Sequence, residues 1–130
     1  MHKIEERRYM KKILLAEDDT VVRVVASQML ERLGYEVISS EDGDAALRVF
    51  LGDPDQFDAI LTDQIMPRLN GIKLAEEIAK INPKMPIVLY SGFAPLESEI
   101  PGNIDGFIAK PFSQKELGEL LDRVITLKTR

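Results

Sequence analysis

Residues 60–71 read ILTDQIMPRLNG, and they carry a short apolar run directly into an acidic residue. The apolar run predicts a strand over Asp58–Thr62 that ends at Asp63. From Gly71 onward, apolar residues recur at the three- and four-residue spacing of a helix, which predicts a helix over Gly71–Ile81. A strand that passes through a short loop into a helix is the repeating unit of α/β folds.

The same alternation continues on both sides of this segment. Short apolar runs predict four further strands, over Ile13–Ala16, Tyr35–Ser39, Ile87–Tyr90 and Gly106–Ala109. A helix that begins near Thr20 has one apolar face, which we predict to comprise Val22, Val25, Ala26, Met29 and Leu33. A short helix is predicted over Gly43–Phe50, and Ser113 with Glu116 forms a capping box for the last helix. The alternation predicts one α/β domain whose parallel sheet is covered by helices on both faces.

Length and composition narrow the class of protein. The 130 residues suit a single domain, and the 45% hydrophobic and 30% charged residues are typical of a globular protein. The absence of cysteine excludes disulfides, thiolate metal sites and thiol catalysis. Since the sequence shows neither a membrane-length apolar run nor a signal-peptide pattern, we predict a cytoplasmic protein that does not enter a membrane.

Charge is distributed unevenly along the chain. The formal net charge is −5, but residues 1–12 contain five basic and two acidic residues, so that the remainder carries −8. An acidic body argues against nucleic-acid binding through the domain itself. We therefore predict a basic leader or linker over residues 1–11 and a folded domain over residues 12–128.

Acidic residues follow two of the predicted strands. Glu17, Asp18 and Asp19 come after the first strand, and Asp63 comes after the third. If these strands are neighbours, the acids converge at one edge of the sheet, where like charges about 4 Å apart repel by roughly 4 kcal/mol. Such a cluster requires a cation or a shifted protonation state, and oxygen ligands without histidine or cysteine favour Mg²⁺. Helix capping is the alternative role for these acids, and it suits Asp19 in particular.

The remaining strand ends add a hydroxyl group and an ammonium group. Ser91 follows the fourth predicted strand, and Lys110 follows the fifth. Metal-binding carboxylates, an ammonium group and a hydroxyl group together suit phosphoryl transfer, which depends mainly on positioning and on neutralising oxygen charge. An aspartate can itself accept the phosphoryl group.

Four blocks of the sequence together resemble the receiver domains of two-component response regulators. The blocks are ILLAEDD at 13–19, ILTDQIMPRLNG at 60–71, IVLYSG at 87–92 and IAKPF at 108–112. The most specific signal is Asp63 followed by Met66, Pro67 and Gly71. The resemblance covers nearly the whole domain, and it implies a flavodoxin-like, doubly wound sheet of five parallel strands in the order 2-1-3-4-5.

The resemblance also implies roles for individual residues. Asp63 is similar in position to the phosphoacceptor of the family, with Ser91 and Lys110 assisting the transfer. Glu17, Asp18, Asp63 and the backbone carbonyl of Ile65 match the ligands of Mg²⁺. Ser91 and Phe107 match the residues that switch position on phosphorylation, and the Lys110–Pro111 peptide bond is expected to be cis.

The expected partner is a histidine kinase or a phosphotransfer protein, and a phosphorylation-dependent dimer is a further expectation of the resemblance. The chain would then be a phosphoacceptor that assists its own phosphorylation and dephosphorylation, rather than an enzyme that acts on other substrates. The sequence does not reveal the cognate kinase, the signal or the output partner. It also leaves open whether the domain is free-standing or part of a larger protein such as a hybrid sensor histidine kinase.

Three features depart from the common pattern of the family. Glu17 stands where many members have aspartate, which leaves open whether it binds the metal directly or through water. Ser91 replaces the commoner threonine. Lys110 follows Ser91 by only 19 positions, and the segment from Ala94 to Gly102 contains two prolines. We therefore expect an abbreviated fourth helix.

Three other classes of protein fit the sequence less well. A flavodoxin-like cofactor binder would need a phosphate-binding loop after the first strand, where three acids would repel a phosphate. An aspartate-nucleophile phosphatase resembles a pattern with a second aspartate two residues after the first, and Ile65 occupies that position. A degenerate receiver that acts only as a constitutive interaction domain would not need the acids, the hydroxyl group and the lysine that phosphoryl transfer uses. All of these groups are present in this sequence.

Overall fold

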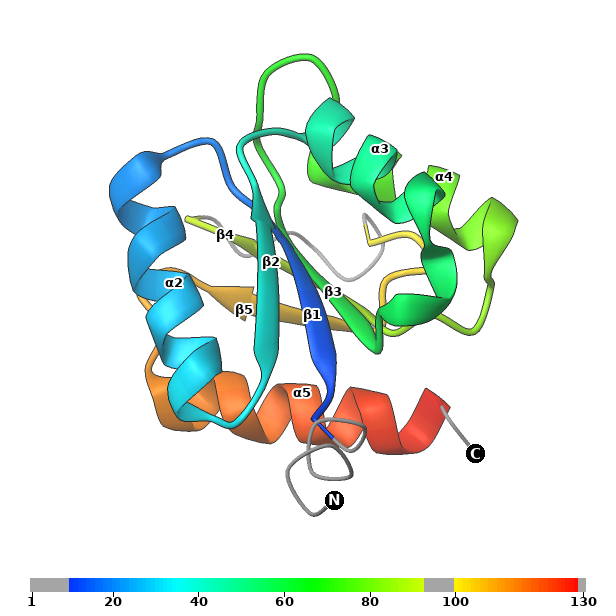
Figure 1. Cartoon of the computed structure of the whole chain (residues 1–130). Helices are drawn as coiled ribbons and strands as arrows, with labels where there is room; N and C mark the ends of the chain where they lie inside the picture. Colours follow the sequence, from blue (N-terminus) through cyan, green and yellow to red (C-terminus); the bar gives the residue numbers. More distant parts are fainter. Residues whose placement is uncertain (1–9, 93–99, 129–130) are drawn as a thin grey trace, which may run out of the picture.

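Five parallel strands form one sheet in the order β2-β1-β3-β4-β5 (Figure 1). The computed structural model describes residues 10–92 and 100–128. The strands are β1 (Lys12–Ala16), β2 (Glu36–Ser40), β3 (Ala59–Asp63), β4 (Ile87–Ser91) and β5 (Gly106–Ala109). The predicted fold class and strand order are confirmed, and every strand begins and ends within one residue of its predicted bounds.

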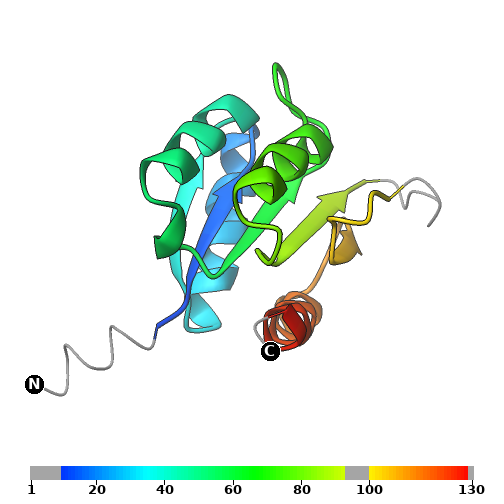
Figure 2. The same cartoon turned by 90° about the vertical axis from the view of Figure 1, so that its right-hand side faces the viewer.

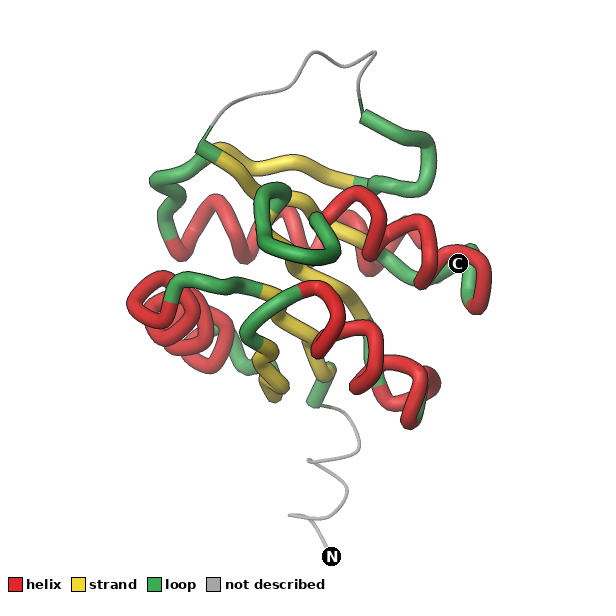
Figure 3. The backbone as a smooth tube through the Cα atoms, turned by 90° about the horizontal axis from the view of Figure 1, so that it is seen from above, coloured by secondary structure: helices red, strands yellow, loops and turns green. Residues whose placement is uncertain are grey.

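The described helices lie on both faces of the sheet. They are α2 (Thr20–Arg32), α3 (Gly43–Gly52), α4 (Gly71–Ile81) and α5 (Gln114–Lys128), with a 3₁₀ turn η1 over Pro54–Gln56. Helices α3 and α4 lie side by side, and α5 lies across the sheet from them (Figure 2). Viewed from above, the strands run between helices (Figure 3). The expected doubly wound arrangement is therefore present.

Alternate residues of the strands divide the core into two clusters. Ile13 and Leu15 pack with α2 and α5 on one face, whereas Leu14 and Ala16 pack with α3 and α4 on the other. This division follows from the two-residue period of a strand, in which successive side chains point to opposite faces. Because β1, β3 and β4 are covered on both sides, their sequences are almost continuously apolar.

Side chains cap the helices much as the sequence suggests. Asp19 accepts hydrogen bonds from the backbone N–H groups of Val21 and Val22 at the start of α2. Ser113 and Glu116 form the reciprocal bonds of the predicted capping box. Gly34 follows α2 with a φ of 95°, a conformation that glycine adopts readily after a helix.

Two apolar residues that fit the helical spacing are exposed rather than buried. Val25 is 44% exposed, because the buried stripe of α2 centres on Ala26 and Leu30 and leaves Val25 beyond its edge. Ile81 is 45% exposed, and it is the last residue of α4. The strand predicted at Tyr35 begins one residue later, since the backbone N–H of Tyr35 donates to Leu30 O at the end of α2.

Two predictions concern residues that the structure leaves largely undescribed. The sequence predicts an abbreviated helix between β4 and β5, within 94–102, and residues 93–99 lie outside the described part of the chain. Most of the predicted basic leader also lies outside it, so the boundaries 1–11 and 12–128 stay predictions. Among the helices in the described ranges, none has the length and apolar character needed to cross a membrane.

Candidate functional site

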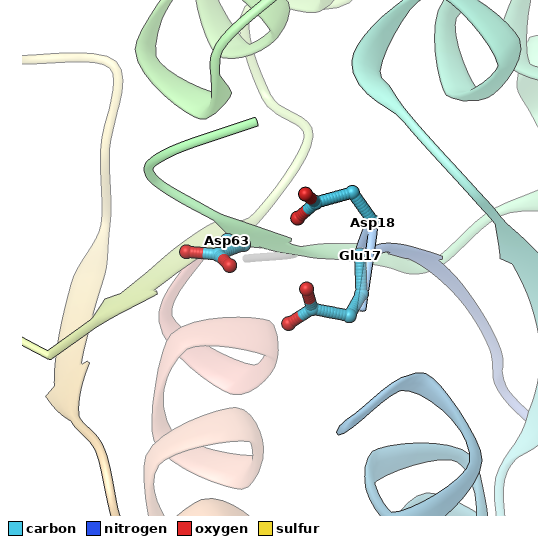
Figure 4. Close-up of side chains that lie close together, drawn as sticks. All are labelled: Glu17, Asp18 and Asp63. Atoms are coloured by element: carbon cyan, nitrogen blue, oxygen red, sulfur yellow. The ribbon is translucent and has the colours of Figure 1, made fainter. Parts of the chain in front are cut away.

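Three carboxylates meet where β1 and β3 end. These strands are paired in register, with Ala16 opposite Thr62, so that the residues after them emerge at the same edge of the sheet. One oxygen from each of Glu17, Asp18 and Asp63 can be chosen so that all three lie within 4.8 Å of one another (Figure 4). The predicted convergence of acids is therefore present, and it supplies only the oxygen ligands that Mg²⁺ prefers.

Glu17 is fully buried and firmly held. Its Oε1 accepts a hydrogen bond of 2.6 Å from the hydroxyl group of Tyr90, and its Oε2 accepts one of 3.0 Å from the backbone N–H of Asp19. The side chain of Arg23 donates to the Glu17 carbonyl oxygen at 2.8 Å. The Glu17 N–H donates to Ser40 O at 3.0 Å. A buried carboxylate needs such partners, because burying an unpaired charge is strongly unfavourable.

Asp63 is paired with a cation. Lys110 Nζ donates to Asp63 Oδ2 at 3.1 Å, and it lies 3.5 Å from Glu17 Oε1. The other Asp63 oxygen accepts from the Ile65 N–H at 3.2 Å. Lys110 precedes a cis peptide bond to Pro111, as expected. Although burial disfavours the charged amine, its bonds to Asp63 and Glu17 outweigh that effect and raise the pKa of Lys110.

The acid cluster also shifts the protonation of its neighbours. Partial desolvation raises the pKa of Asp18, and the neighbouring Glu17 carboxylate adds to the shift, whereas Lys110 acts in the opposite direction. Burial raises the pKa of Tyr90 as well, and the negative charge of Glu17 reinforces the effect. Tyr90 is therefore a neutral hydrogen-bond donor at physiological pH.

The loop from Asp63 to α4 is held close to the site. Gly71 lies so near Asp63 that a Cβ at this position would meet the Asp63 carbonyl oxygen at 2.2 Å, so only glycine fits. Arg68 has a φ of 67°, and its guanidinium group lies 2.6 Å from a carboxylate oxygen of Asp42. The second Asp42 oxygen caps α3 by accepting from the Ala45 N–H at 2.8 Å. This ion pair ties the β3–α4 loop to the β2–α3 loop.

The structure places the other predicted residues around this edge. Ser91 is buried at the end of β4, one residue beyond Tyr90, whose Cα pairs in register with that of Asp63. Phe107 lies in β5 opposite Leu89 and is partly buried against the core on the α3–α4 side. Ile65 is 63% exposed beside Asp63.

Tyr90 and Arg68 are site residues that the sequence analysis missed. The apolar pattern of residues 87–90 indicates only a buried strand and assigns no role to Tyr90, although a buried phenol normally finds a hydrogen-bond partner. Arg68 lies in a loop, and nothing local in the sequence pairs it with Asp42, 26 residues away. The phenol in an otherwise aliphatic strand was the available signal for Tyr90.

An apolar groove adjoins the acidic site. It has a volume of about 440 Å³ and runs between α2 and the segment after β5, where it is lined by Val21, Val22, Val25, Ala26, Met29, Lys110, Pro111 and Phe112. Lys110 belongs both to this groove and to the ion pair with Asp63.

Comparison with known proteins identifies the family. The sequence model of the response regulator receiver domain matches residues 13–122. The chain belongs to this family. It is a receiver domain of the two-component type, and the recognition made from the four sequence blocks is confirmed.

The relatives differ in length and setting. The response regulator receiver protein CpdR of Brucella abortus is 33% identical over 120 residues, which cover 89% of this receiver domain and 98% of that protein. A probable transcriptional regulator of Cyanophora paradoxa is also 33% identical, but the chain spans only 45% of its length. The receiver domain therefore occurs in its relatives both nearly alone and as part of longer proteins.

Two solved structures show the same fold. The response regulator protein TrrA from Thermotoga maritima, in complex with Mg²⁺ and BeF, has a TM-score of 0.82 and 28% identity, and the match covers 88% of this chain and 99% of that one. The receiver domain of a sensor histidine kinase from Pseudomonas aeruginosa, with a magnesium ion in its active-site cleft, has a TM-score of 0.80 and 31% identity. That match covers 90% of this chain and 98% of the other.

Proposed function

We propose that this receiver domain is a cytoplasmic phosphoacceptor module of a phosphorelay, in which Asp63 accepts a phosphoryl group from a histidine kinase or a phosphotransfer protein. The observation that carries the proposal is the position of Asp63. One of its oxygens lies 3.1 Å from Lys110 Nζ, and its carboxylate belongs to the cluster with Glu17 and Asp18. This arrangement combines a nucleophile with the cationic and metal-binding groups that phosphoryl transfer needs.

The acid cluster suits Mg²⁺ as the cofactor. Glu17, Asp18, Asp63 and the backbone carbonyl of Ile65 would hold it, and the cluster contains no histidine or cysteine that would favour a softer metal. When bound, Mg²⁺ neutralises charge on the phosphoryl oxygens. A Glu17 carboxylate already bonded through both oxygens is compatible with contact through water.

The protein groups then have distinct tasks. A carboxylate oxygen of Asp63 forms the new bond to phosphorus while the bond from phosphorus to the donor nitrogen breaks. Lys110 pairs with the phosphoryl oxygens, and the Ser91 hydroxyl group donates a hydrogen bond to them. The same groups would later assist hydrolysis of the acyl phosphate, so the chain promotes its own reactions rather than those of another substrate.

Phosphorylation would change the surface of the domain through Ser91 and Phe107. A phosphoryl group on Asp63 adds charge and acceptor oxygens that draw the Ser91 hydroxyl group inward. The space vacated beside β4 can be filled by the Phe107 ring, which lies on the neighbouring strand opposite Leu89. The altered face of β5 and α5 would then favour a different partner or a phosphorylation-dependent dimer.

The groove beside α2 offers the phosphodonor a place to dock. Its lining is mainly aliphatic, and Val21 and Val25 are exposed although they are large apolar residues. A helix of the donor protein seated there would lie against Lys110 and bring its phosphohistidine to the edge of the sheet that holds Asp63. The partner surface and the chemical site would thus share one residue.

A second candidate is a receiver segment of a hybrid sensor histidine kinase. The observation in its favour is the 31% identity to the receiver domain of a Pseudomonas aeruginosa sensor histidine kinase. The two candidates assign the same chemistry to Asp63 and differ in what flanks the domain. A third, a degenerate receiver that acts as a constitutive interaction domain, is disfavoured by the complete set of acid, lysine and hydroxyl groups.

Phosphorylation by a small donor tests the proposed function. Wild-type protein is incubated with acetyl phosphate, with Mg²⁺ or with a chelator, and its intact mass is measured. We expect one added phosphoryl group that requires Mg²⁺, and we expect Asp18→Ala to abolish the addition because it removes a metal ligand. Asp55→Ala, which removes an exposed acid far from the site in η1, is the control and should be phosphorylated normally. No adduct on the wild type, or full phosphorylation without the metal, would contradict the proposal.

A further inference from the structure

Tyr90 lies at the centre of the site without being part of its proposed chemistry. Its side chain is fully buried, and its hydroxyl group donates to Glu17 Oε1 at 2.6 Å. A bond this short between a hydroxyl group and a carboxylate is a charge-assisted hydrogen bond, which is stronger than one between neutral groups. The bond joins residues 73 positions apart, so it links the end of β4 to the end of β1.

The ring of Tyr90 is fixed independently of its hydroxyl group. Phe112 packs edge-on against it, with the ring centroids 5.5 Å apart. Lys110 Nζ lies 5.0 Å from the ring centroid, within the range of a cation–π contact. Because these contacts and the strand hold the ring, the hydroxyl group is presented to Glu17 in a fixed direction.

The orientation of the Glu17 carboxylate depends on the direction of the Tyr90 hydroxyl group. Its Oε2 is bound by the backbone N–H of Asp19, and Tyr90 binds Oε1. Together the two donors determine how the carboxylate is rotated relative to Asp18 and Asp63. Without the hydroxyl group, Lys110, at 3.5 Å, would be the partner that Oε1 keeps among the described residues, and the carboxylate could turn while Oε2 stays hydrogen-bonded to the Asp19 N–H.

We infer that Tyr90 is a positioning residue for the metal site, whose hydroxyl group holds the Glu17 carboxylate in the orientation that the cation needs. The inference rests on the proposed function, since it assigns Tyr90 a part in the Mg²⁺ site. Removal of such an outer partner of a metal ligand typically weakens metal binding by about 10–100-fold. Tyr90 therefore sets the Mg²⁺ concentration at which the domain can be phosphorylated.

The test compares two tyrosines. Tyr90→Phe removes only the hydroxyl group and keeps the ring that Phe112 and Lys110 contact. Tyr35→Phe is the control, because it likewise removes only a hydroxyl group, from a partly buried tyrosine that lies near the far end of α2, against α5. Mg²⁺ affinity is measured by titration while amide chemical shifts are followed. We expect Tyr90→Phe to bind Mg²⁺ at least about tenfold more weakly than the wild type, and Tyr35→Phe to bind it equally well.

The rate of phosphorylation by acetyl phosphate separates positioning from other roles. If Tyr90 acts through the metal site, the variant needs more Mg²⁺ for half-maximal rate but approaches the wild-type rate at saturation. In a Glu17→Gln background, Tyr90→Phe should cause no further loss of affinity. If Tyr90→Phe does not fold, Tyr90→Met, which also fills the space with apolar atoms, is measured in its place.

The outcomes distinguish this inference from the proposed function. A wild type that binds no Mg²⁺ would overturn both. A wild type that binds it, together with a Tyr90→Phe variant of equal affinity, would overturn the role of Tyr90 alone. A variant with unchanged Mg²⁺ dependence but a lower rate at saturation would also overturn it, because Tyr90 would then act elsewhere.

Discussion

Lys110 Nζ lies 3.1 Å from Asp63 Oδ2 and 3.5 Å from Glu17 Oε1, so a single ammonium group bridges the carboxylates that end β1 and β3. Tyr90 contacts the same group from one side with its ring. Within the described residues, the acids of the site thus have a cationic partner supplied by the protein itself. Lys110 and a bound cation would both compensate the same negative charge.

We expect Lys110→Met to destabilise the metal-free protein more than the metal-bound one. Loss of the amine removes the hydrogen-bond donor of Asp63 Oδ2 and the positive charge beside Glu17, which typically costs about 1–3 kcal/mol, and Mg²⁺ would restore part of that lost stability. Urea unfolding in chelator and in Mg²⁺ measures the difference. Lys128→Met, which breaks the remote ion pair with Asp105, is the control and should lose the same stability in both conditions. An equal loss for Lys110→Met in both conditions would contradict the prediction.

The ion pair between Arg68 and Asp42 predicts a specific pH dependence of stability. The hydrogen bond from the Ala45 N–H and the pairing with Arg68 lower the pKa of Asp42 below its usual value of 3.8. The ionised form therefore stabilises the fold above that usual value, and this contribution is lost as the pH falls through the lower pKa of the folded state. Asp42→Asn keeps an oxygen to cap α3 but removes the charge.

We expect Asp42→Asn to lose less stability than the wild type when the pH is lowered from about 5 to about 2, with urea midpoints as the measurement. Asp44→Asn is the control. The carboxylate of Asp44 lies 4.0 Å from Arg68 and is about half exposed, so its contact with Arg68 is weaker and its removal should leave the pH dependence unchanged. If Asp42→Asn keeps the full acid sensitivity of the wild type, the ion pair does not stabilise the loop.

Two adjacent valines test the docking groove. Val25 lines the groove, whereas Val24 is similarly exposed but does not line it, with exposed fractions of 44% and 50%. We expect Val25→Glu to slow phosphoryl transfer from a histidine kinase that phosphorylates the wild type, because the charge would be buried against an apolar partner. Transfer from acetyl phosphate should be unaffected, and Val24→Glu should change neither rate. Equal transfer from the kinase to Val25→Glu and wild type would exclude the groove as the docking site.

The coupling between Ser91 and Phe107 can be followed by NMR spectroscopy. We expect beryllofluoride with Mg²⁺ to shift the amide resonances of both residues along with those next to Asp63, because the hydroxyl group moves inward and the ring follows. Ser91→Ala should retain the shifts next to Asp63 but lose that of Phe107. If the amide resonance of Phe107 does not shift in the wild type, Phe107 does not transmit the change at Asp63 to the surface of the domain.

The sequence predicted the fold well because the strands and helices differ in the period of their apolar residues. It also predicted that Glu17, Asp18 and Asp63 converge, since parallel strands present their carboxyl ends at one edge. The errors have local physical causes. Val25 fits the helical spacing but lies beyond the narrow buried stripe of α2, and Tyr35 closes the end of that helix rather than opening β2.

The contacts that the sequence could not reveal are those between distant residues. The bond from Tyr90 to Glu17 and the ion pair of Arg68 with Asp42 depend on the three-dimensional arrangement of loops and strand ends. The sequence does not indicate the partner of either residue. A tyrosine in a buried strand fits the apolar pattern of the core, and an arginine in a loop is usually exposed to solvent. Both contacts surround the predicted chemical residues and hold them in place.

Localisation of the phosphoryl group tests the central claim most directly. Wild type, Asp63→Asn and the control Asp55→Asn are treated with acetyl phosphate and Mg²⁺, and the modified peptide is identified by mass spectrometry before and after hydroxylamine. We predict a hydroxylamine-labile phosphoryl group on Asp63 in the wild type and in Asp55→Asn, and none in Asp63→Asn. An equally abundant, hydroxylamine-labile adduct in Asp63→Asn would show that another residue is the phosphoacceptor and would contradict the account.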